Sequence, residues 1–374
     1  MRILVAGRGF DAPGRHVLGV FELDQARALR DAGHDVRFAA LDTRSIRSLR
    51  PIGCRSYTLE GIPVIYGALP VGARPVGLSA WAQRRASEGI WRRLDQDGWR
   101  PELVHAHFGA AMLDAARRRG IPTVFTEHFS NANHDEVSRE ELARERAAYA
   151  AADRVLCVSR ALADRIGERN AIAPLVVPNI VDPVFSTPPV RPRDDHKSFH
   201  IVSAGRLIPS KGYAELLRAF AAALRGTDAH LMIIGDGEER AALEALTESL
   251  GLAGHVTFTG QLDRAEMVTL YETADIFALA SHGETFGLAY AEALAMGLPT
   301  VATDCGGPRD FLDDSNGILV PNGDETALAG ALRQMMLRCA DYDREAIARR
   351  ARERFSPQKI AAELTAIYKD VIGC

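Results

Sequence analysis

Two glutamates at a short spacing, Glu284 and Glu292, have the clearest potential for chemistry in this sequence. Glu284 lies in a turn bounded by Gly283 and Gly287, and Glu292 lies in an alanine-rich helix expected to begin after Gly287. The first amides of a helix carry the positive end of its dipole and bind anions. A loop carboxylate, a helical carboxylate and the amides between them could therefore hold a sugar, a ribose and a phosphate together.

A basic pair follows a strand predicted at 199–204. Gly205 and Arg206 come directly after the strand, and Lys211 precedes a predicted helix. Ligands of open α/β sheets bind at the carboxyl ends of strands, and an arginine fork with a lysine suits a diphosphate. The glycine spacing is not that of a Walker loop. Gly235, in a Gly-Asp-Gly turn after the next strand, is expected to line the same crevice, although an ordinary turn would explain it too.

Polar residues also end two strands predicted in the first half of the chain. His105 and His107 alternate at the end of the strand at 102–106, so they point to one face of the sheet. Glu127 and His128 end the following strand. We expect these residues to line a cleft. A zinc site is the alternative, but no further ligand pattern supports it.

A dinucleotide-binding fingerprint competes for the N-terminus. Gly7, Gly9 and Ala12 fit G-x-G-x-x-A after a strand, and Asp42 ends the second strand, where a ribose-binding acid would lie. An NAD-dependent oxidoreductase is therefore an alternative function. The fingerprint requires a helix that starts inside the motif, whereas the amphipathic helix is predicted to begin near Val20.

Bulk composition limits the classes of function. The chain has 374 residues and a formal net charge of −4, which gives no overall attraction to nucleic acid or anionic membranes. Its five scattered cysteines form no C-x-x-C pair, which favours reduced thiols in the cytoplasm. We expect no leader, because the chain opens with a predicted strand. No apolar run reaches the roughly 18 residues of a membrane-spanning helix.

Short apolar runs alternate with helical patterns along the whole chain, which predicts an α/β protein with parallel sheets. The length favours two domains. We expect two Rossmann-like domains facing across a cleft, at 1–185 and 198–356, separated by a proline-rich linker. The tail, 343–372, is predicted as two helices. The last helix either packs on the second domain or crosses back to the first.

The predicted elements set the positions of these residues. Strands are predicted near 2–6, 35–40, 63–66, 102–106, 122–126, 154–158, 174–177, 199–204, 230–234, 255–259, 275–280, 299–303 and 317–320. Helices are predicted near 20–32, 109–119, 137–151, 160–169, 212–225, 237–250, 263–273, 287–297, 308–313 and 324–339.

The stretch 81–94 is basic and contains two tryptophans, Trp81 and Trp91. One interpretation is weak contact with a lipid-linked acceptor at a membrane surface. The other is a solvated helix whose tryptophans pack inward, because Gly89 and Asp95 interrupt an amphipathic face.

With these motifs, the chain resembles the retaining glycosyltransferases of family 4, part of the bacterial glycosyltransferases of group 1, which have the two-domain GT-B fold. The second-domain motifs are specific, and the first-domain motifs are weaker. The matching segments are Gly33–Val36, His107, Asp153–Ser159, Pro178–Asp182, Gly205-Arg206 with Lys211, Gly235–Gly237, Glu284 and Glu292 with Gly297 and Pro299, Cys305–Pro308 and Asn316–Val320.

The resemblance implies roles for several of the matching residues. Arg206 and Lys211 would neutralise the donor diphosphate in place of a metal, Glu292 would hold the ribose, and Glu284 would hold the donor sugar. The implied catalytic residues are His107, Arg206, Lys211 and Glu284. The implied donor-binding residues are Gly19, Gly205, Arg206, Lys211, Gly235, Phe286, Gly287, Leu288 and Glu292.

The implied activity is sugar transfer from a UDP- or GDP-sugar to a hydroxyl of a polysaccharide, lipid-linked or natural-product acceptor, with retention and without a cofactor. The acceptor would lie near Glu127, His128 and the loop 129–136. The resemblance also favours a last helix, 357–374, that crosses back to the first domain. Many relatives have paired glycines in the first loop, but this chain has only Gly19 there. A nucleotide-sugar epimerase on the same fold is the remaining alternative.

Overall fold

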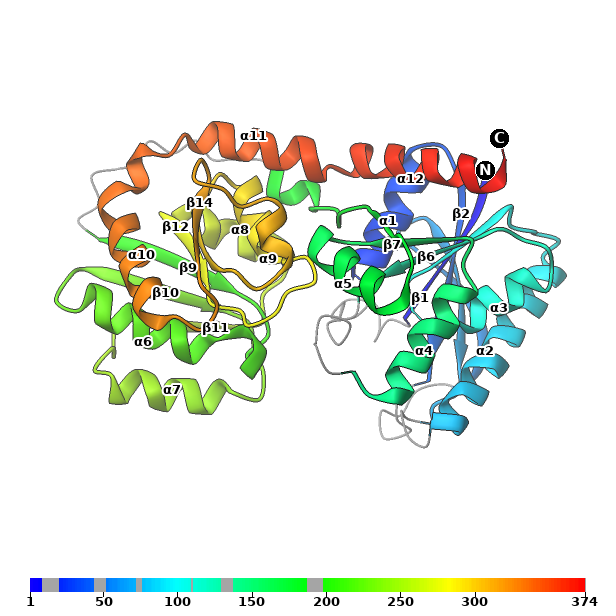
Figure 1. Ribbon diagram of the computed structural model, residues 1–374, viewed down its shortest axis with the longest axis horizontal. Coiled ribbons are helices and arrows are strands. Elements are labelled where there is room, and N and C mark those ends of the chain that lie inside the picture. The colour runs from blue at the N-terminus through cyan, green and yellow to red at the C-terminus, as the bar shows by residue number, and fades with distance from the viewer. Residues whose placement is uncertain are drawn as a thin grey trace. The chain divides into compact units, whose positions relative to one another are not determined.

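The computed structural model describes residues 1–8, 20–43, 52–71, 76–108, 110–128, 137–186 and 198–373 (Figure 1). The chain forms two compact units, one of Met1–Ile180 with Pro357–Cys374 and one of Val181–Ser356. Each unit is built on a largely or wholly parallel sheet with helices around it. The predicted architecture of two Rossmann-like α/β domains is therefore confirmed.

The first unit contains an eight-stranded sheet in the order β3-β4-β2-β1-β5-β6-β7-β8. Its strands are β1 (Arg2–Arg8), β2 (Asp35–Asp42), β3 (Gly53–Leu59), β4 (Ile62–Ala68), β5 (Leu103–Ala106), β6 (Thr123–Glu127), β7 (Arg154–Cys157) and β8 (Leu175–Val176). Its helices are α1 (Val20–Asp31), α2 (Val76–Gln96), α3 (Ala111–Arg117), α4 (Arg139–Ala150), α5 (Arg160–Asn170) and α12 (Pro357–Ile372).

Strand β3 was not predicted from the sequence. It pairs antiparallel with β4 through a tight turn in which Glu60 and Gly61 have positive φ angles of 49° and 80°. Most of its residues are exposed, because it is the outer strand of the sheet. An exposed edge strand needs no apolar run, so the apolar pattern used to predict strands is missing here.

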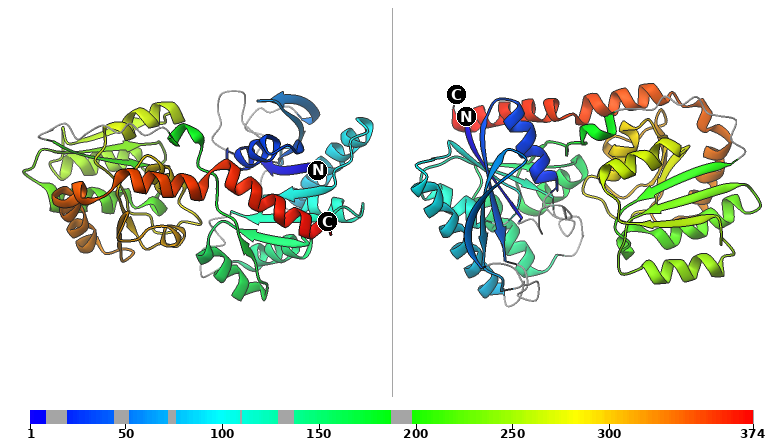
Figure 2. Two further views of the ribbon diagram at one scale, coloured as in Figure 1. Left: turned by 90° about the horizontal axis from the view of Figure 1, so that it is seen from above. Right: turned by 180° about the vertical axis from the view of Figure 1, so that it is seen from behind.

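Helix α12 belongs to the core of the first unit. Ile360, Leu364 and Tyr368 are fully buried and pack in the same apolar cluster as residues of β1, β2 and α1. His34, after α1, lies with Nε2 2.8 Å from the Thr365 hydroxyl. Figure 2 shows α12 beside α1. The last helix therefore covers the first unit's sheet although it follows the second unit in sequence.

The second unit contains a six-stranded, fully parallel sheet in the order β11-β10-β9-β12-β13-β14. Its strands are β9 (Phe199–Ala204), β10 (Ala229–Ile234), β11 (Val256–Gly260), β12 (Ile276–Leu279), β13 (Thr300–Thr303) and β14 (Gly317–Val320). Its helices are α6 (Tyr213–Leu224), α7 (Arg240–Ser249), α8 (Arg264–Thr273), α9 (Leu288–Ala295), α10 (Glu325–Arg338) and α11 (Arg344–Phe355).

One predicted helix of the second unit is wrong. The segment 308–313 contains a single 3₁₀ turn, Gly307–Asp310, in place of an α-helix. The turn ends at Phe311, whose side chain is buried against other aromatic rings. No helix in the described part of either unit is long and apolar enough to cross a membrane.

Candidate active site

An ion pair between Lys211 and Glu284 lies beyond the carboxyl ends of two strands in the second unit's sheet. Lys211 Nζ donates to Glu284 Oε1 over 2.6 Å, and Ser281 Oγ donates to the same oxygen over 2.8 Å. The two charged side chains are only 22 % and 11 % exposed, so water screens the pair weakly. The residues follow β9 and β12, which are neighbours in the sheet. The structure therefore brings together two of the four predicted catalytic residues.

The loop after β13 holds the Glu284 turn by backbone contacts. Glu284 donates its N–H to the Cys305 carbonyl over 3.1 Å and accepts from the Gly307 N–H over 2.9 Å. A Cβ at Gly307 would lie 2.4 Å from the Phe286 carbonyl oxygen, so only glycine fits. The segment Cys305–Pro308 thus has a structural reason to be glycine-rich, and sequence reasoning had given it no role.

Close backbone packing also explains the glycines after β9 and β10. Gly235 has φ 137°, and a Cβ there would lie 1.9 Å from the Gly205 carbonyl oxygen. Gly212 has φ 64° and would collide with the Ala280 carbonyl in the same way. A Cβ at Gly205 would lie 3.8 Å from Lys211 Cδ, so the lysine stem runs beside this glycine. The glycines let three strand ends and the lysine converge.

Helix α9 begins at Leu288 directly after this turn. Its N-cap, Gly287, has φ 90° and provides no side-chain cap. The first amides of a helix have no acceptor within the helix, so these N–H groups are suited to an anion. The Phe286 side chain is buried, with its ring centroid 5.4 Å from those of Phe311 and Phe355. Only the backbone of Phe286 is therefore suited to contact a ligand.

Arg206 and Glu292, the other predicted donor-binding side chains, differ in exposure. Arg206 is exposed, and its side chain has no hydrogen bond or ion pair to a described residue, although its carbonyl accepts from the Ile208 N–H over 2.9 Å. Glu292 is buried on α9. Burial and, second, the charge of Glu292 raise the pKa of Tyr271 well above its ordinary value, so Tyr271 neighbours Glu292. No described contact holds the Arg206 side chain, whereas the Glu292 side chain is buried in the protein.

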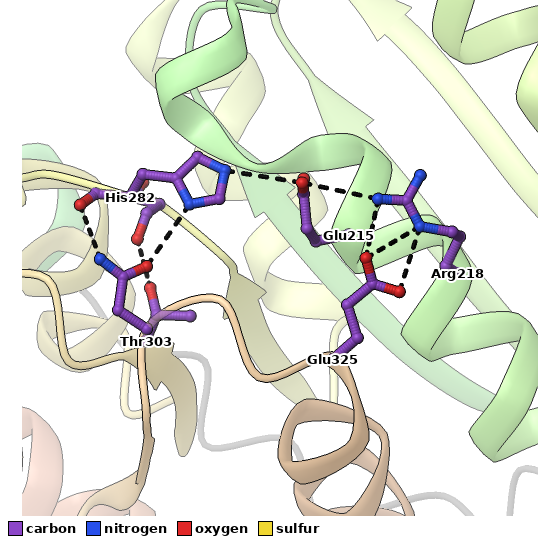
Figure 3. A network of polar contacts seen from close by, with 7 residues as sticks. Glu215, Arg218, His282, Thr303 and Glu325 are labelled. Carbon is purple, nitrogen blue, oxygen red and sulfur yellow. Dashed lines mark hydrogen bonds and ion pairs between the residues drawn. The ribbon is translucent and has the colours of Figure 1, made fainter.

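A polar network that includes His282, beside the Glu284 turn, was not predicted from the sequence. Arg218 Nη2 and Nε of α6 donate to Glu325 Oε1 over 2.7 and 2.9 Å, and Glu215 lies 3.5 Å from Arg218 and 3.6 Å from His282 (Figure 3). The His282 N–H donates to the Ser210 carbonyl over 2.9 Å. The network ties the turn after β12 to the starts of α6 and α10.

In the first unit, His107 and His128 form a buried pair. His107 Nδ1 lies 2.8 Å from His128 Nε2. Burial, with the charge of His105 as a smaller cause, lowers the pKa of both imidazoles well below the ordinary value, so both are neutral. Two neutral rings carry two N–H groups, and one lies between them. Of the outer atoms, His107 Nε2 and His128 Nδ1, one therefore donates and the other accepts, and neither bonds to a described residue.

The prediction that His105 lines a cleft is wrong. His105 is fully buried, with Nδ1 2.6 Å from the Tyr368 hydroxyl and Nε2 2.7 Å from the Thr126 hydroxyl. Burial lowers its pKa to about 3, so it is a neutral core residue. Glu127 is also buried and accepts a hydrogen bond of 2.9 Å from Tyr149.

A charged pair beside the histidines was missed from the sequence. Arg8 Nε lies 3.6 Å from Glu22 Oε1, and the Arg8 guanidinium carbon lies 3.9 Å from the Phe108 ring centroid. Burial raises the pKa of Glu22 from 4.5 to about 7, against the opposing charge of Arg8. A Cβ at Gly7 would lie 3.2 Å from Glu22 Cβ. Gly7 is therefore the sequence feature that could have indicated close packing here.

The remaining predictions for the first unit concern the cofactor and metal alternatives. Asp42 is buried and accepts a 2.6 Å hydrogen bond from Tyr66, so it is a structural acid and not an exposed ribose ligand. Helix α1 begins at Val20, as predicted. Gly9, Ala12, Gly19 and the loop 129–136 lie outside the described residues. Among the described residues, no group of three His, Cys, Asp or Glu could hold a metal ion.

Two family models match consecutive parts of the chain. Residues 19–185 match Glycosyltransferase Family 4, and residues 189–354 match Glycosyl transferases group 1. A D-inositol 3-phosphate glycosyltransferase of Xylanimonas cellulosilytica is 31% identical over 308 residues, which cover 73% of this chain and 72% of that protein. The chain belongs to the group 1 glycosyltransferases. These matches give no support to the epimerase and oxidoreductase alternatives.

Other similar proteins cover different shares of this glycosyltransferase. A D-inositol 3-phosphate glycosyltransferase of Segniliparus rotundus is 30% identical over 62% of this chain and 58% of its own length. A GDP-mannose-dependent alpha-mannosyltransferase of Mycolicibacterium smegmatis is 28% identical over 92% of this chain and 91% of its own length.

Solved structures match the fold over the full length. Sucrose-phosphate synthase from Thermosynechococcus elongatus has a TM-score of 0.80 and 20% identity, and covers 100% of this chain and 99% of its own. HepE from Anabaena, in complex with UDP and glucose, has a TM-score of 0.77 and 22% identity, and covers 99% of this chain and 100% of its own. This glycosyltransferase therefore has the GT-B fold.

Proposed function

We propose that this group 1 glycosyltransferase moves a sugar from a UDP- or GDP-sugar to a hydroxyl of a polysaccharide, lipid-linked or natural-product acceptor, with retention and without a metal. The ion pair of 2.6 Å between Lys211 and Glu284 carries the proposal, because it supports a role for a cation and a carboxylate shortly before the start of α9. Among the similar proteins, HepE was solved with UDP and one mannosyltransferase depends on GDP-mannose, so both bases stay in the proposal.

Departure of the nucleoside diphosphate requires stabilisation of its negative charge. Lys211 has three N–H donors, of which the Glu284 bond uses one, so the ammonium can also donate to a phosphate. Arg206 supplies a planar fork for the same diphosphate. The α9 amides of Gly287 and Leu288 add their dipole. These positive groups take the place of a metal in the proposed mechanism.

The donor's remaining parts have their own proposed contacts. Glu292 holds the ribose hydroxyls, and Glu284 holds the sugar together with the backbone of Phe286. Gly205 and Gly235 are proposed to let backbone approach the donor closely. Gly19 remains a proposed phosphate contact in the first loop.

The acceptor is proposed to bind the first unit near His107, His128 and Glu127. The outer nitrogens of the neutral histidine pair are buried, and they carry one donor and one acceptor, the set that a sugar hydroxyl needs. In the proposed transfer, the bond from the anomeric carbon to the phosphate oxygen breaks. The acceptor oxygen then bonds to that carbon on the same face, and its proton passes to the departing phosphate. We also propose that the enzyme acts in the cytoplasm, in peripheral contact with the inner face of the membrane.

Substitution of Lys211 tests the leaving-group part. We expect Lys211→Ala to lower kcat roughly 10²–10³-fold, because one fixed group facing the developing charge is lost. Lys359→Ala is the matched control, since Lys359 is an exposed lysine paired with Glu363 on α12. Initial rates are measured with excess EDTA and with excess Mg²⁺. Unchanged activity of Lys211→Ala, or wild-type activity abolished by EDTA, would contradict the metal-free model.

Two further measurements define donor and stereochemistry. Thermal shifts with UDP-, GDP- and TDP-sugars identify the base, and NMR of the product gives its anomeric configuration. Isomerisation of a UDP-sugar without acceptor would favour an epimerase, and an inverted product would remove the retaining mechanism.

A further inference from the structure

Arg8 combines a buried counter-ion with a partly exposed side chain. It is the last residue of β1, and its side chain is 34 % exposed, whereas the Glu22 side chain beside it is completely buried. Because β1, β5 and β6 run parallel, Arg8 lies at the same end of the sheet as His107 and His128. Ligands of open α/β sheets bind at this end. Arg8 is therefore placed to contact a ligand, and the proposed transfer reaction gives it no role.

Aromatic rings hold the Arg8 side chain beside the histidine pair. Its guanidinium carbon lies 3.9 Å from the centroid of the Phe108 ring and 5.7 Å from that of Phe21. The ring centroids of Phe21 and His128 are 4.4 Å apart. Burial lowers the pKa of His107 and of His128, and the nearby charge of Arg8 adds to both decreases. Stacking uses the face of a guanidinium, and its N–H groups point outward along the edge.

The charge of this cluster determines which anion it is suited to bind. Arg8 has one positive charge, and Glu22 Oε1 lies 3.6 Å from its Nε. Burial raises the pKa of Glu22 to about 7, so near neutral pH Glu22 is protonated in part of the molecules and then does not repel a second anion. A carboxylate has a single charge and pairs bidentately with a guanidinium. A phosphate monoester carries about −1.5 to −2 charges, which is more than one arginine balances.

We propose that the acceptor ends in a uronic acid, and that Arg8 binds the carboxylate of this sugar beside the histidine pair. Arg8 and His128 both lie against Phe108, with the guanidinium carbon 3.9 Å and the imidazole centroid 6.0 Å from its ring centroid, so one sugar ring can contact both. A neutral acceptor would explain the histidine pair but not an arginine whose counter-ion is buried at a cost. The inference rests on the proposed position of the acceptor and narrows its chemical class.

Binding of methyl glycosides to the full-length protein tests the proposal, with Kd values from ligand-detected NMR. Glucuronate, galacturonate and mannuronate are each compared with the neutral sugar that differs only at C6. We expect a uronate to bind more tightly than its neutral counterpart. Arg8→Gln should weaken uronate binding roughly 10–100-fold, because charge-assisted hydrogen bonds are lost, and leave the neutral sugars unchanged. Arg349 is exposed on α11, and Arg349→Gln should bind like the wild type.

Glu22→Gln separates recognition of the ligand from stabilisation of the fold. This substitution keeps Arg8 and removes the negative charge beside it, so uronate binding should become several-fold tighter. If the Arg8–Glu22 pair has only a structural role, both substitutions weaken binding or leave it unchanged. The Glu22→Gln result therefore decides the question even if Arg8→Gln does not fold.

Several results would overturn the assignment. The first is that no uronate binds more tightly than its neutral counterpart, or that uronate binding is unchanged in Arg8→Gln or weaker in Glu22→Gln. Tighter binding of glucose 6-phosphate than of glucuronate would identify a phosphate site, and weaker binding of UDP or GDP by Arg8→Gln would assign the arginine to the donor. All these assays measure binding. A failed Lys211 test would therefore remove the transfer mechanism without changing their result.

Discussion

Glu22 shows how a single residue can have an unfavourable position in the fold. Its carboxylate is wholly buried, and Arg8 is the charged side chain beside it. Arg8 approaches to 3.6 Å and offsets only part of the cost of burial. Such groups are candidates for function, and Glu22 lies under an arginine that also contacts the aromatic ring beside the histidine pair.

The charge of Glu22 predicts a pH dependence of stability. Its folded pKa of about 7 lies above the ordinary 4.5, so the fold favours the protonated form. The stability from this group is complete below about pH 4.5 and is lost as the pH rises through 7. We expect Glu22→Gln to gain stability relative to the wild type between pH 5 and pH 8, by at most about 3 kcal/mol.

Thermal melts of both proteins across this pH range measure the effect. Glu248→Gln is the control, because Glu248 is an exposed glutamate on α7. A melting-temperature difference between Glu22→Gln and the wild type that stays constant with pH would contradict a raised pKa for Glu22.

At the scale of elements, α12 stabilises a sheet to which it is not adjacent in sequence. Leu364 is fully buried in the core cluster of the first unit. We expect Leu364→Ala to lower the free energy of unfolding by about 2–5 kcal/mol, because a cavity remains. Urea titration measures this. Leu337→Ala is the matched control, since Leu337 is 74 % exposed and its substitution should change stability by less than about 0.5 kcal/mol. Equal effects of the two substitutions would refute the role of α12.

At the scale of the whole molecule, the two units have separate cores but the chain passes through them in the order first, second, first. We expect truncation after Ser356 to reduce amide protection in residues 1–180, which lose the cover of α12, while residues 181–355 keep their protection. Hydrogen exchange with mass spectrometry measures both regions in one sample. Equal loss in both units, or loss only in the second, would contradict this assignment of α12.

The strand–helix series of the second unit was predictable because each element has its own signal. Apolar runs locate the buried parallel strands, and glycines mark the strand ends at which backbone approaches backbone, as at Gly235. Strand β3 lacked such a signal, since an exposed edge strand needs no apolar run. The spacing of His105 and His107 predicted a shared face. It gave no information on whether that face was covered, and Tyr368 covers His105.

The sequence alone therefore determined the class of fold and the strand ends of the candidate site, because these depend on local periodicity and on glycine. Tertiary structure decided the partners. Lys211 meets Glu284 across 73 residues and His105 meets Tyr368 across 263. Such pairs depend on which strands become neighbours and on which unit the last helix covers. Sheet order and long-range packing set both, and no local pattern in the chain encodes them.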